Sequence, residues 1–385
     1  MKRLYWHLSK ASWQVYALMA FLSILGLIMV ETFKVEIKQP FYEKKLKAAQ
    51  IMHNGLSLIK SHRMAALKEI APLDKRTDPT ESGMIGVLIS PITSSPGDLQ
   101  AKQTCINPNW AAVLVHMLKQ AGVKEGDTIA MGVSGSFPAI NLAALSAAEA
   151  LNLKVLLISS LASSSWGANI PGLTWLDMEN ILYRERVIPS KSIAASLGGR
   201  SDRAKGMSQE GRGILQETIL KNDISPLPAA KTRGENIDAR MAYYQKHAEG
   251  KSIAAYINVG HGFISLGGES AEKFFKPGVN LTAKKRQAID IDSVMSRFIQ
   301  QGVPVIHMWP VSTIAQQYAL PLTTRKLPTI GEGKIFKRIG YRNSLTAGVL
   351  VFLILALLAL IRMDIGYRIF NHRQKVVKSP PEPMV

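Results

Sequence analysis

The sequence predicts an α/β protein, a Rossmann-like, doubly wound and mostly parallel sheet between two transmembrane helices. Between residues 83 and 333, short continuous apolar runs alternate with helical stretches, as in parallel sheets that are covered on both faces. A charge-free apolar run lies near each end of the chain. With 385 residues, of which 47% are hydrophobic, the chain is too apolar to be disordered and long enough to build a large core.

Five apolar runs are the predicted strands, over residues 84–89, 128–133, 154–159, 253–259 and 303–307. The helices predicted between them cover residues 108–121, 138–151, 212–220 and 290–301. These runs lack the alternation of a half-exposed strand, which favours burial on both sides. The stretch 167–250 is too long for one crossover and is predicted to be an insertion or a subdomain.

The first apolar run, residues 11–30, is 20 residues long without a charge, enough for a hydrocarbon core of roughly 30 Å. Lys2, Arg3 and Lys10 precede it and favour a cytoplasmic N-terminus over residues 1–10. A cleaved signal peptide is the alternative, but the sequence ETFKVEIK stands where a cleavage site of small residues is needed. We therefore expect an uncleaved transmembrane helix.

The second predicted transmembrane helix covers residues 345–361 and is followed by a basic tail over 362–385. Two spans place both termini in the cytoplasm and residues 31–344 outside an inner cell membrane. That outer region begins with a helical stalk or packed first helix over 31–82, with its long helix at 41–70. The extracytoplasmic α/β domain follows over 83–333, and a basic juxtamembrane linker over 334–344.

The charge balance suits an anionic partner, and a basic surface that only keeps the chain soluble is the alternative. The whole chain has a net charge of +19, and the region between the spans has +13, from 39 basic (47 − 3 − 5) and 26 acidic (28 − 0 − 2) residues. Such a surface suits a polyanion or an anionic membrane. Nucleic acid is disfavoured because no basic run is interleaved with aromatic residues.

Neither a metal nor a cofactor is expected. A single cysteine, Cys105, excludes a disulfide framework and any multi-cysteine metal site. None of the eight histidines has a partner at local ligand spacing. The glycine pattern around residues 132–136 also lacks the signatures of a P-loop or a dinucleotide fingerprint.

Small polar residues follow every predicted strand, and parallel sheets bind ligands beyond the carboxyl ends of their strands. We expect an oxyanion or carboxylate site there, although turns and helix caps favour the same residue types. The candidate ligand-binding residues are Ser90, Thr93, Ser94, Ser134, Gly135, Ser136, Ser160, Ser165, Trp166, Asn169, Gly260 and Gly262. Arg200 and Arg203 are added as loop arginines that can bind carboxylates in a bidentate manner.

The sequence GVSGS at residues 132–136 resembles a nucleophile elbow, G-x-S-x-G, with Ser136 in place of the last glycine. Ser134 is then the candidate nucleophile of a serine hydrolase or transferase. The candidate bases are His261 and His307, and the candidate orienting acids are Asp177 and Asp202. Capping or ligand-binding roles for the serines are the alternative. Asp177 and Glu179 form either a pair of acids for hydrolysis or an acidic surface pair.

Several stretches together resemble one family, the poly-gamma-glutamate system proteins, found with the genes of poly-gamma-glutamate capsule synthesis. They are SPITSS (90–95), LQAKQT (99–104), NPN (107–109), AGVKEGD (121–127), GVSGSFPAIN (132–141), ISS (158–160), SWGAN (165–169), TWLDME (174–179) and AASLGG (194–199). The resemblance covers most of residues 84–330. His261 departs from the family pattern, which has glycines after the position of Asn258, and this weakens a catalytic role for it.

The resemblance implies an accessory membrane subunit of capsule synthesis and export in the cell envelope. Its implied partners are an ATP-dependent ligase, a small polytopic membrane protein and the anionic polymer. It implies no chemical step, so a non-enzymatic subunit that binds or guides the polymer is the favoured hypothesis. The alternatives are a hydrolase or transferase that trims or releases the polymer through Ser134, and an assembly scaffold.

Overall fold

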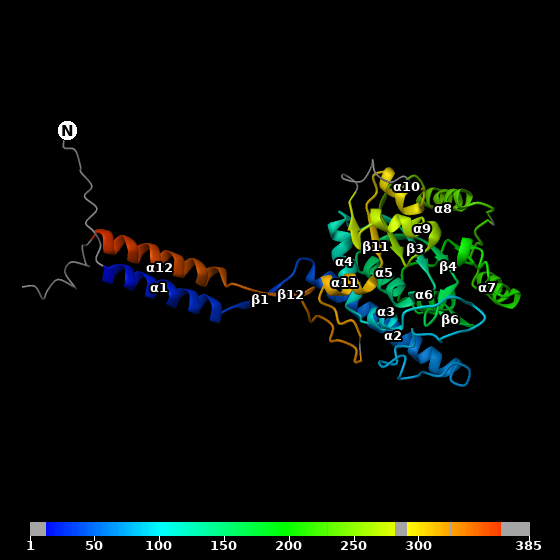
Figure 1. The fold of residues 1–385 in the computed structure, drawn as a ribbon, viewed down its shortest axis with the longest axis horizontal. Coiled ribbons are helices and arrows are strands. Elements are labelled where there is room, and N and C mark those ends of the chain that lie inside the picture. Colours follow the sequence, from blue (N-terminus) through cyan, green and yellow to red (C-terminus); the bar gives the residue numbers. More distant parts are fainter. Residues whose placement is uncertain (1–12, 229, 282–290, 324, 363–385) are drawn as a thin grey trace, which may run out of the picture. The chain divides into compact units, whose positions relative to one another are not determined.

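The computed structural model describes residues 13–228, 230–281, 291–323 and 325–362 (Figure 1). The chain divides into two compact units, one of residues 1–37 with 338–385 and the other of residues 38–337. The predicted cytoplasmic segment 1–10 and residues 363–385 of the predicted tail lie outside the described residues.

The larger unit is built on a six-stranded mixed sheet with the strand order β10-β11-β9-β3-β4-β8. Its strands are β3 (Thr128–Ser134), β4 (Lys154–Ser160), β8 (Ala194–Ser196), β9 (Ile253–Val259), β10 (Gly278–Asn280) and β11 (Val305–Met308). Neighbouring strands are parallel except for the antiparallel pair β10 and β11 at one edge. From β3 the chain builds outward through β4 and β8, and it then returns to β9 on the other side. The strand order therefore reverses between β3 and β9, which is where such sheets place their ligands.

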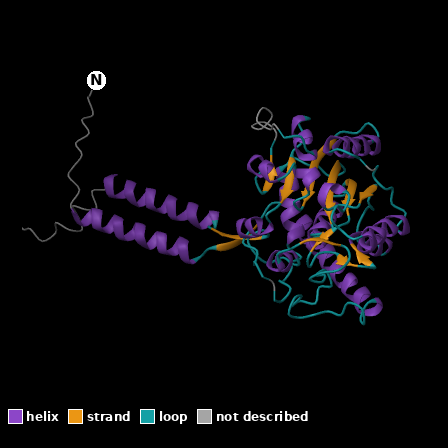
Figure 2. Ribbon diagram, turned by 45° about the vertical axis from the view of Figure 1, so that its right-hand side comes forward, coloured by secondary structure: helices purple, strands orange, loops and turns teal. Residues whose placement is uncertain are grey.

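Helices cover both faces of this sheet (Figure 2). On one side, α4 (Trp110–Gln120) and α5 (Pro138–Ala150) contact the sheet, and α2 (Tyr42–Ala66) packs against these two helices. On the other side, α8 (Arg233–Ala248) and α10 (Val294–Gln300) contact the sheet, and α9 (Phe263–Leu266) packs against them. The side chains of β3 alternate accordingly, because Ile129 and Met131 enter one hydrophobic cluster and Ala130 enters the other. Burial on both faces explains why the strands are continuously apolar in sequence.

The remaining elements of the larger unit are short and lie around the sheet. They are α3 (Leu99–Cys105), α6 (Trp175–Arg184), α7 (Gln209–Lys221), α11 (Val311–Gln317), the strands β2 (Thr93–Ser95), β5 (Ser163–Ser164), β6 (Asn169–Ile170) and β7 (Leu173–Thr174), and the 3₁₀ helices η1 (Arg200–Asp202) and η2 (Glu269–Phe274). β2 and β5 pair in parallel outside the main sheet.

The predicted strand at 84–89 is wrong, because this segment forms no strand. The Asn169 side chain bonds both backbone groups of Val87, at 3.0 Å and 2.8 Å, and so takes the place of a neighbouring strand. A Cβ atom at Gly86 would come within 2.0 Å of the Asn169 Oδ1. The Asn169 side chain therefore holds Val87 in place of a strand partner, while Met84 and Ile85 enter the core.

The smaller unit contains α1 (Trp13–Thr32) and α12 (Asn343–Arg362), which pack against each other. It also contains all but one residue of each of the paired strands β1 (Val35–Lys38) and β12 (Lys337–Gly340). A Cβ atom at Gly26 would lie 2.7 Å from the Val349 Cγ1, so the two helices approach closely there. At the end of α1, the Glu31 carboxylate accepts a hydrogen bond from the Tyr341 hydroxyl at 3.2 Å.

Among the residues that the structure describes, no helix combines the length and the apolar character needed to cross a membrane. The predicted transmembrane helices at 11–30 and 345–361, and the two-pass topology built on them, are contradicted by this finding. Length alone would allow a span, because α1 and α12 have 20 residues each. Both helices include polar residues, among them Gln14, Glu31 and Thr32 in α1 and Asn343, Ser344 and Arg362 in α12, so their apolar runs are shorter than the helices. Ala11 and Ser12 of the first predicted run lie outside the described residues.

Arg63 of α2 organises the chain that follows the helix. Only 3% of the residue is exposed, and its guanidinium donates to the carbonyl oxygens of Ala71, Pro72, Gly83 and Ile85 at 2.5–3.2 Å. One side chain thus satisfies four backbone acceptors of a segment without regular structure.

We predict that Arg63→Met lowers the free energy of unfolding by about 2–4 kcal/mol, because it leaves these buried carbonyl groups without donors. Urea denaturation of the full chain measures the change. Arg76→Met is the matched control, because the Arg76 side chain is 90% exposed, and its midpoint should not move. Equal midpoints for both variants would contradict the role given to Arg63.

A second buried group, Glu179 of α6, should give the stability a pH dependence. Its carboxylate accepts hydrogen bonds from the Ser192 backbone and hydroxyl, both at 2.7 Å. Burial raises its pKa to about 7 in spite of these bonds. Because the unfolded chain has the lower pKa, the folded state binds the proton more tightly. Its contribution to stability is therefore full below the unfolded value and is lost as the pH rises through about 7.

We predict that Glu179→Gln flattens this dependence. Between about pH 5 and about pH 8 the wild-type chain should lose on the order of 1–3 kcal/mol more stability than the variant. Urea titrations of both proteins at the two pH values measure the difference. Parallel losses in the two proteins would show that Glu179 is already ionised at the lower pH.

Candidate functional site

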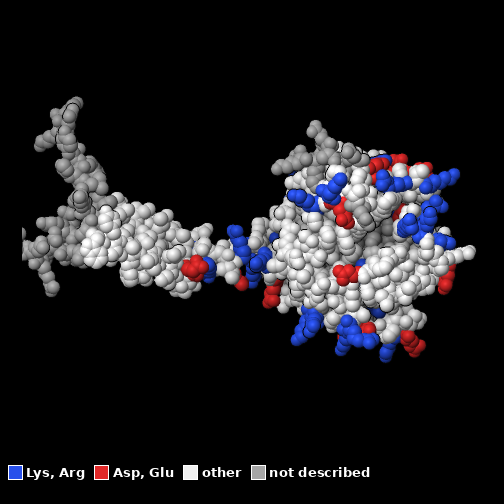
Figure 3. Space-filling model, viewed as in Figure 1, with Lys and Arg blue, Asp and Glu red and all other residues white. Residues whose placement is uncertain are grey.

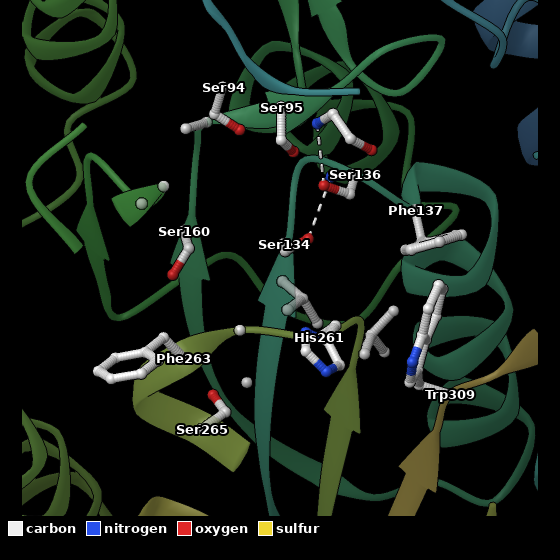
Figure 4. A pocket seen from close by; sticks show the side chains of 18 of the residues that line it. Ser94, Ser95, Ser134, Ser136, Phe137, Ser160, His261, Phe263, Ser265 and Trp309 are labelled. Carbon is white, nitrogen blue, oxygen red and sulfur yellow. Dashed lines mark hydrogen bonds between the residues drawn. The ribbon is translucent and has the colours of Figure 1, made fainter. Parts of the chain in front are cut away.

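A cavity of about 890 Å³ lies at the carboxyl ends of β3, β4 and β9, beside the point where the strand order reverses (Figure 4). Its lining is rich in hydroxyl groups, from Ser94, Ser95, Ser134, Ser136, Ser160, Ser164 and Ser265. Its charged and titratable lining residues are Asp98, Lys102, Arg200, Asp202, Arg240, His261 and Glu272. The volume falls within the range of small-molecule sites. We call it the switch-point pocket.

Ser134 ends β3 and begins the turn into α5. Its Oγ accepts a hydrogen bond from the Ser136 backbone N–H at 3.1 Å, which Figure 4 shows as a dashed line. A Cβ atom at Gly135 would lie 2.3 Å from the Leu161 carbonyl oxygen, so only glycine fits this position. The sharp turn of an elbow is therefore present, but the Ser134 hydroxyl is used to hold it.

His261 follows β9 and lines the same pocket. Its Nε2 lies 2.5 Å from a Glu272 carboxylate oxygen, and its ring centroid lies 5.8 Å from that of Trp309. Within the described part of the chain, no hydrogen bond joins Ser134 to His261. The other candidate base, His307, is buried in β11, where its Nδ1 lies 3.1 Å from the Asn258 Nδ2.

Lys102 of α3 is a buried cation at the wall of the pocket, with only 4% of the residue exposed. Its Nζ donates to the Ser136 carbonyl oxygen at 2.5 Å and to the Ser164 Oγ at 2.8 Å. The Nζ also lies 3.7 Å from the centroid of the Phe137 ring. Burial lowers the pKa of Lys102 to about 8. This amine is therefore partly neutral near physiological pH.

Arg240 of α8 forms a buried ion pair with Asp202 of η1. The Arg240 Nη2 lies 2.7 Å from the Asp202 Oδ2 and also donates to the hydroxyls of Ser160 and Ser196 at 3.2 Å and 2.9 Å. The side chains of the two charged residues are only 4% and 5% exposed. Asp202 lies in a strained loop, because Ser201 and Asp202 have φ values of 60° and 59°. The ion pair thus ties this loop to the ends of β4 and β8.

Eight of the sequence-predicted residues line the pocket, namely Ser94, Ser134, Ser136, Ser160, Arg200, Asp202, His261 and Gly262. The others hold the surrounding loops or lie elsewhere. Ser90 and Thr93 bond each other across a turn, and the Asn169 side chain bonds Thr93. The backbone N–H groups of Gly135, Ser165 and Trp166 donate to carbonyl oxygens of neighbouring segments. Gly260 makes the turn after β9 with a φ of +93°.

Arg203 lines a second cavity, of about 720 Å³, instead of the switch-point pocket. Of the candidate acids, only Asp202 lines the switch-point pocket. Asp177 instead closes a capping box with Thr174 at the start of α6, and Glu179 faces Ser192 in the core. These two residues are neither an exposed acidic pair nor part of this pocket.

Sequence reasoning missed Lys102, Ser164 and Arg240. Lys102 lies in a short helix whose other residues look like a surface segment, and Arg240 lies in a helix rich in charged residues. Ser164 is one of three consecutive serines. The only signal was that Lys102 falls within the LQAKQT stretch, which carries part of the family resemblance.

No group of three or more His, Cys, Asp or Glu side chains that could hold a metal ion occurs among the described residues.

We predict that Arg240→Met destabilises the chain by about 3–5 kcal/mol, because it leaves the Asp202 carboxylate buried without its counter-ion. The double variant Arg240→Met with Asp202→Asn should recover part of this loss, since it removes the buried charge as well. Urea denaturation of the two single variants and the double variant measures the coupling. Additive losses would contradict the ion pair.

Neither a family model nor any curated protein or solved structure matches this chain significantly.

Proposed function

We propose that this protein binds poly-gamma-glutamate in the switch-point pocket, as an accessory component of the synthesis and export of that polymer. The observation that carries the proposal is the pocket itself, where seven serine side chains and the cations Lys102, Arg200 and Arg240 meet at the switch point of the sheet. The family resemblance of residues 84–330 supplies the identity of the polymer. The ligase and its polytopic membrane partner are proposed partners on the same ground.

The chemistry of the pocket suits a polymer that carries carboxylates and amide bonds. Hydroxyls donate to carboxylate and carbonyl oxygens, and guanidinium groups bind carboxylates by paired hydrogen bonds. The acids Asp202 and Glu272 are already bonded to Arg240 and His261. Arg200 is exposed at the rim. We therefore assign it the direct contact with a polymer carboxylate.

The excess of basic residues supports the same proposal. Lys and Arg side chains are spread over the visible face of the larger unit, with fewer Asp and Glu side chains between them (Figure 3). Such a surface attracts a polyanion over a distance of about one Debye length and loses this attraction as salt is added. The proposal does not depend on α1 or α12 crossing a membrane.

We predict that the purified full chain binds poly-gamma-glutamate and that Arg200→Ala weakens this binding about tenfold, because one charge-assisted contact is lost. Isothermal titration at about 50 mM and about 300 mM NaCl measures the affinity and its dependence on salt. The binding should weaken at the higher salt concentration.

Two controls separate the pocket from the overall charge. Arg76→Ala removes an exposed arginine outside the pocket lining and should leave the affinity nearly unchanged. Hyaluronan, a carboxylate polymer without glutamyl units, should bind more weakly than poly-gamma-glutamate. Absence of binding at both salt concentrations would leave the scaffold alternative. Equal effects of the two arginine variants would contradict the pocket as the site.

A further inference from the structure

Lys102 and Ser164 form a close pair of a buried amine and a hydroxyl at the wall of the switch-point pocket. The Lys102 Nζ lies 2.8 Å from the Ser164 Oγ, within the range required of a general base and its nucleophile. The amine is fixed on its other sides by the Ser136 carbonyl oxygen and the Phe137 ring. A buried lysine whose pKa is lowered to about 8 can accept a proton near neutral pH.

Ser164 is held so that its hydroxyl stays at the pocket. Its backbone N–H donates to the Ser136 Oγ at 3.0 Å, and β5 pairs with β2. Gly97 lies opposite, and a Cβ atom there would come within 3.2 Å of the Ser164 Oγ and 2.4 Å of the Ser165 carbonyl oxygen. The glycine leaves space beside the hydroxyl that a side chain would fill.

The neighbouring serine of the elbow is less suited to attack. The Ser134 Oγ accepts the Ser136 N–H, and the described hydrogen bonds give it neither a lysine nor a histidine partner. Lys45, the other lysine that is almost fully buried, bonds only the Ile335 carbonyl oxygen, at 2.9 Å. Lys102 alone among the described lysines thus combines burial with a hydroxyl partner that lines a cavity.

We propose that Ser164 and Lys102 form a serine–lysine catalytic dyad that hydrolyses an amide bond of a carboxylate-bearing chain. The proposal rests on the proposed function for its substrate, because it places the gamma-glutamyl amides of the bound polymer beside Ser164. It differs from the Ser134 hypothesis in both the nucleophile and the base.

The proposed hydrolysis consumes one water molecule for each amide bond and needs no other reactant. Neutral Lys102 takes the proton of the Ser164 hydroxyl as Oγ forms a bond to the amide carbonyl carbon. Lys102 then gives this proton to the amide nitrogen, and the C–N bond breaks. The amine product departs, and the acyl group remains on the Ser164 Oγ as an ester. Water attacks the ester with Lys102 as its base, which releases a carboxylic acid and restores the Ser164 hydroxyl.

The first test uses a probe that does not depend on the polymer. The full chain is treated with a fluorophosphonate, which phosphonylates activated serines, and the modified residue is found by peptide mass spectrometry. We expect one label on Ser164. Lys102→Met and Lys102→Arg should both slow the labelling at least about a hundredfold, and the arginine variant keeps the buried cation, so that loss of the base is separated from misfolding.

Lys45→Met and Ser61→Ala are the matched controls. Lys45 is as buried as Lys102, and its pKa is likewise lowered to about 8 by burial, but it has no hydroxyl partner. Ser61 is an exposed serine of α2. Both variants should be labelled at the wild-type rate. Labelling at Ser134 in place of Ser164, or equal rates in the Lys102 and Lys45 variants, would overturn the dyad.

The second test follows the length of poly-gamma-glutamate by size-exclusion chromatography during incubation with the full chain. We expect shortening by the wild-type chain and about a thousandfold slower shortening by Ser164→Ala. Binding of the polymer without labelling or shortening would overturn the dyad and leave the proposed function standing. Labelling of Ser164 without binding of the polymer would support the dyad and refute the proposed function.

Discussion

The parallel pairing of β3 with β4 and β9 is the constraint on which the rest of the larger unit depends. This register brings Ser134 level with Ser160. The turns that follow β3, β4 and β9 therefore all lie at the carboxyl ends of the strands. These turns need glycine where backbones meet, as at Gly135. The groups that these turns present to solvent at the carboxyl ends of the strands include serine hydroxyls and backbone groups. A polar cavity at the switch point is therefore a consequence of the topology.

The central strands could be predicted because they are buried on both faces and so appear as uninterrupted apolar runs. β3, β4 and β9 coincide closely with the predicted segments, and β11 begins two residues later than predicted. The short β8 and β10 carry no such signal, since strands of three residues are shorter than any periodic pattern. Residues 84–89 form no strand although they are apolar, because Met84 and Ile85 are buried outside the sheet while Leu88 and Ile89 are exposed. The transmembrane prediction likewise relied on apolar composition, and among the described residues no helix is both long and apolar enough to cross a membrane.

The candidate site was predictable only in part, for a related physical reason. Ser134, Ser136 and Ser160 stand directly at strand ends, so the topology alone brings them together. Lys102 and Arg240 come from helices that pack over these strand ends. Whether these two side chains reach the pocket depends on how α3 and α8 pack in the folded chain, which no local sequence pattern encodes. In sequence a buried cation looks the same as a solvated one.

The partners of Lys102, more than its burial, argue for a chemical role at the carboxyl ends of the strands, because Lys45 is buried to a similar degree and bonds a carbonyl oxygen. Burial of a lysine disfavours its charged form, and an apolar residue of similar size usually stabilises a core at least as well. Arg63 is also buried, but its bonds to four carbonyl oxygens give it an evident structural task. Lys102 bonds one carbonyl oxygen and one serine hydroxyl that lines a cavity. A purely structural role explains the first bond, whereas the second is the arrangement that proton transfer from Ser164 requires.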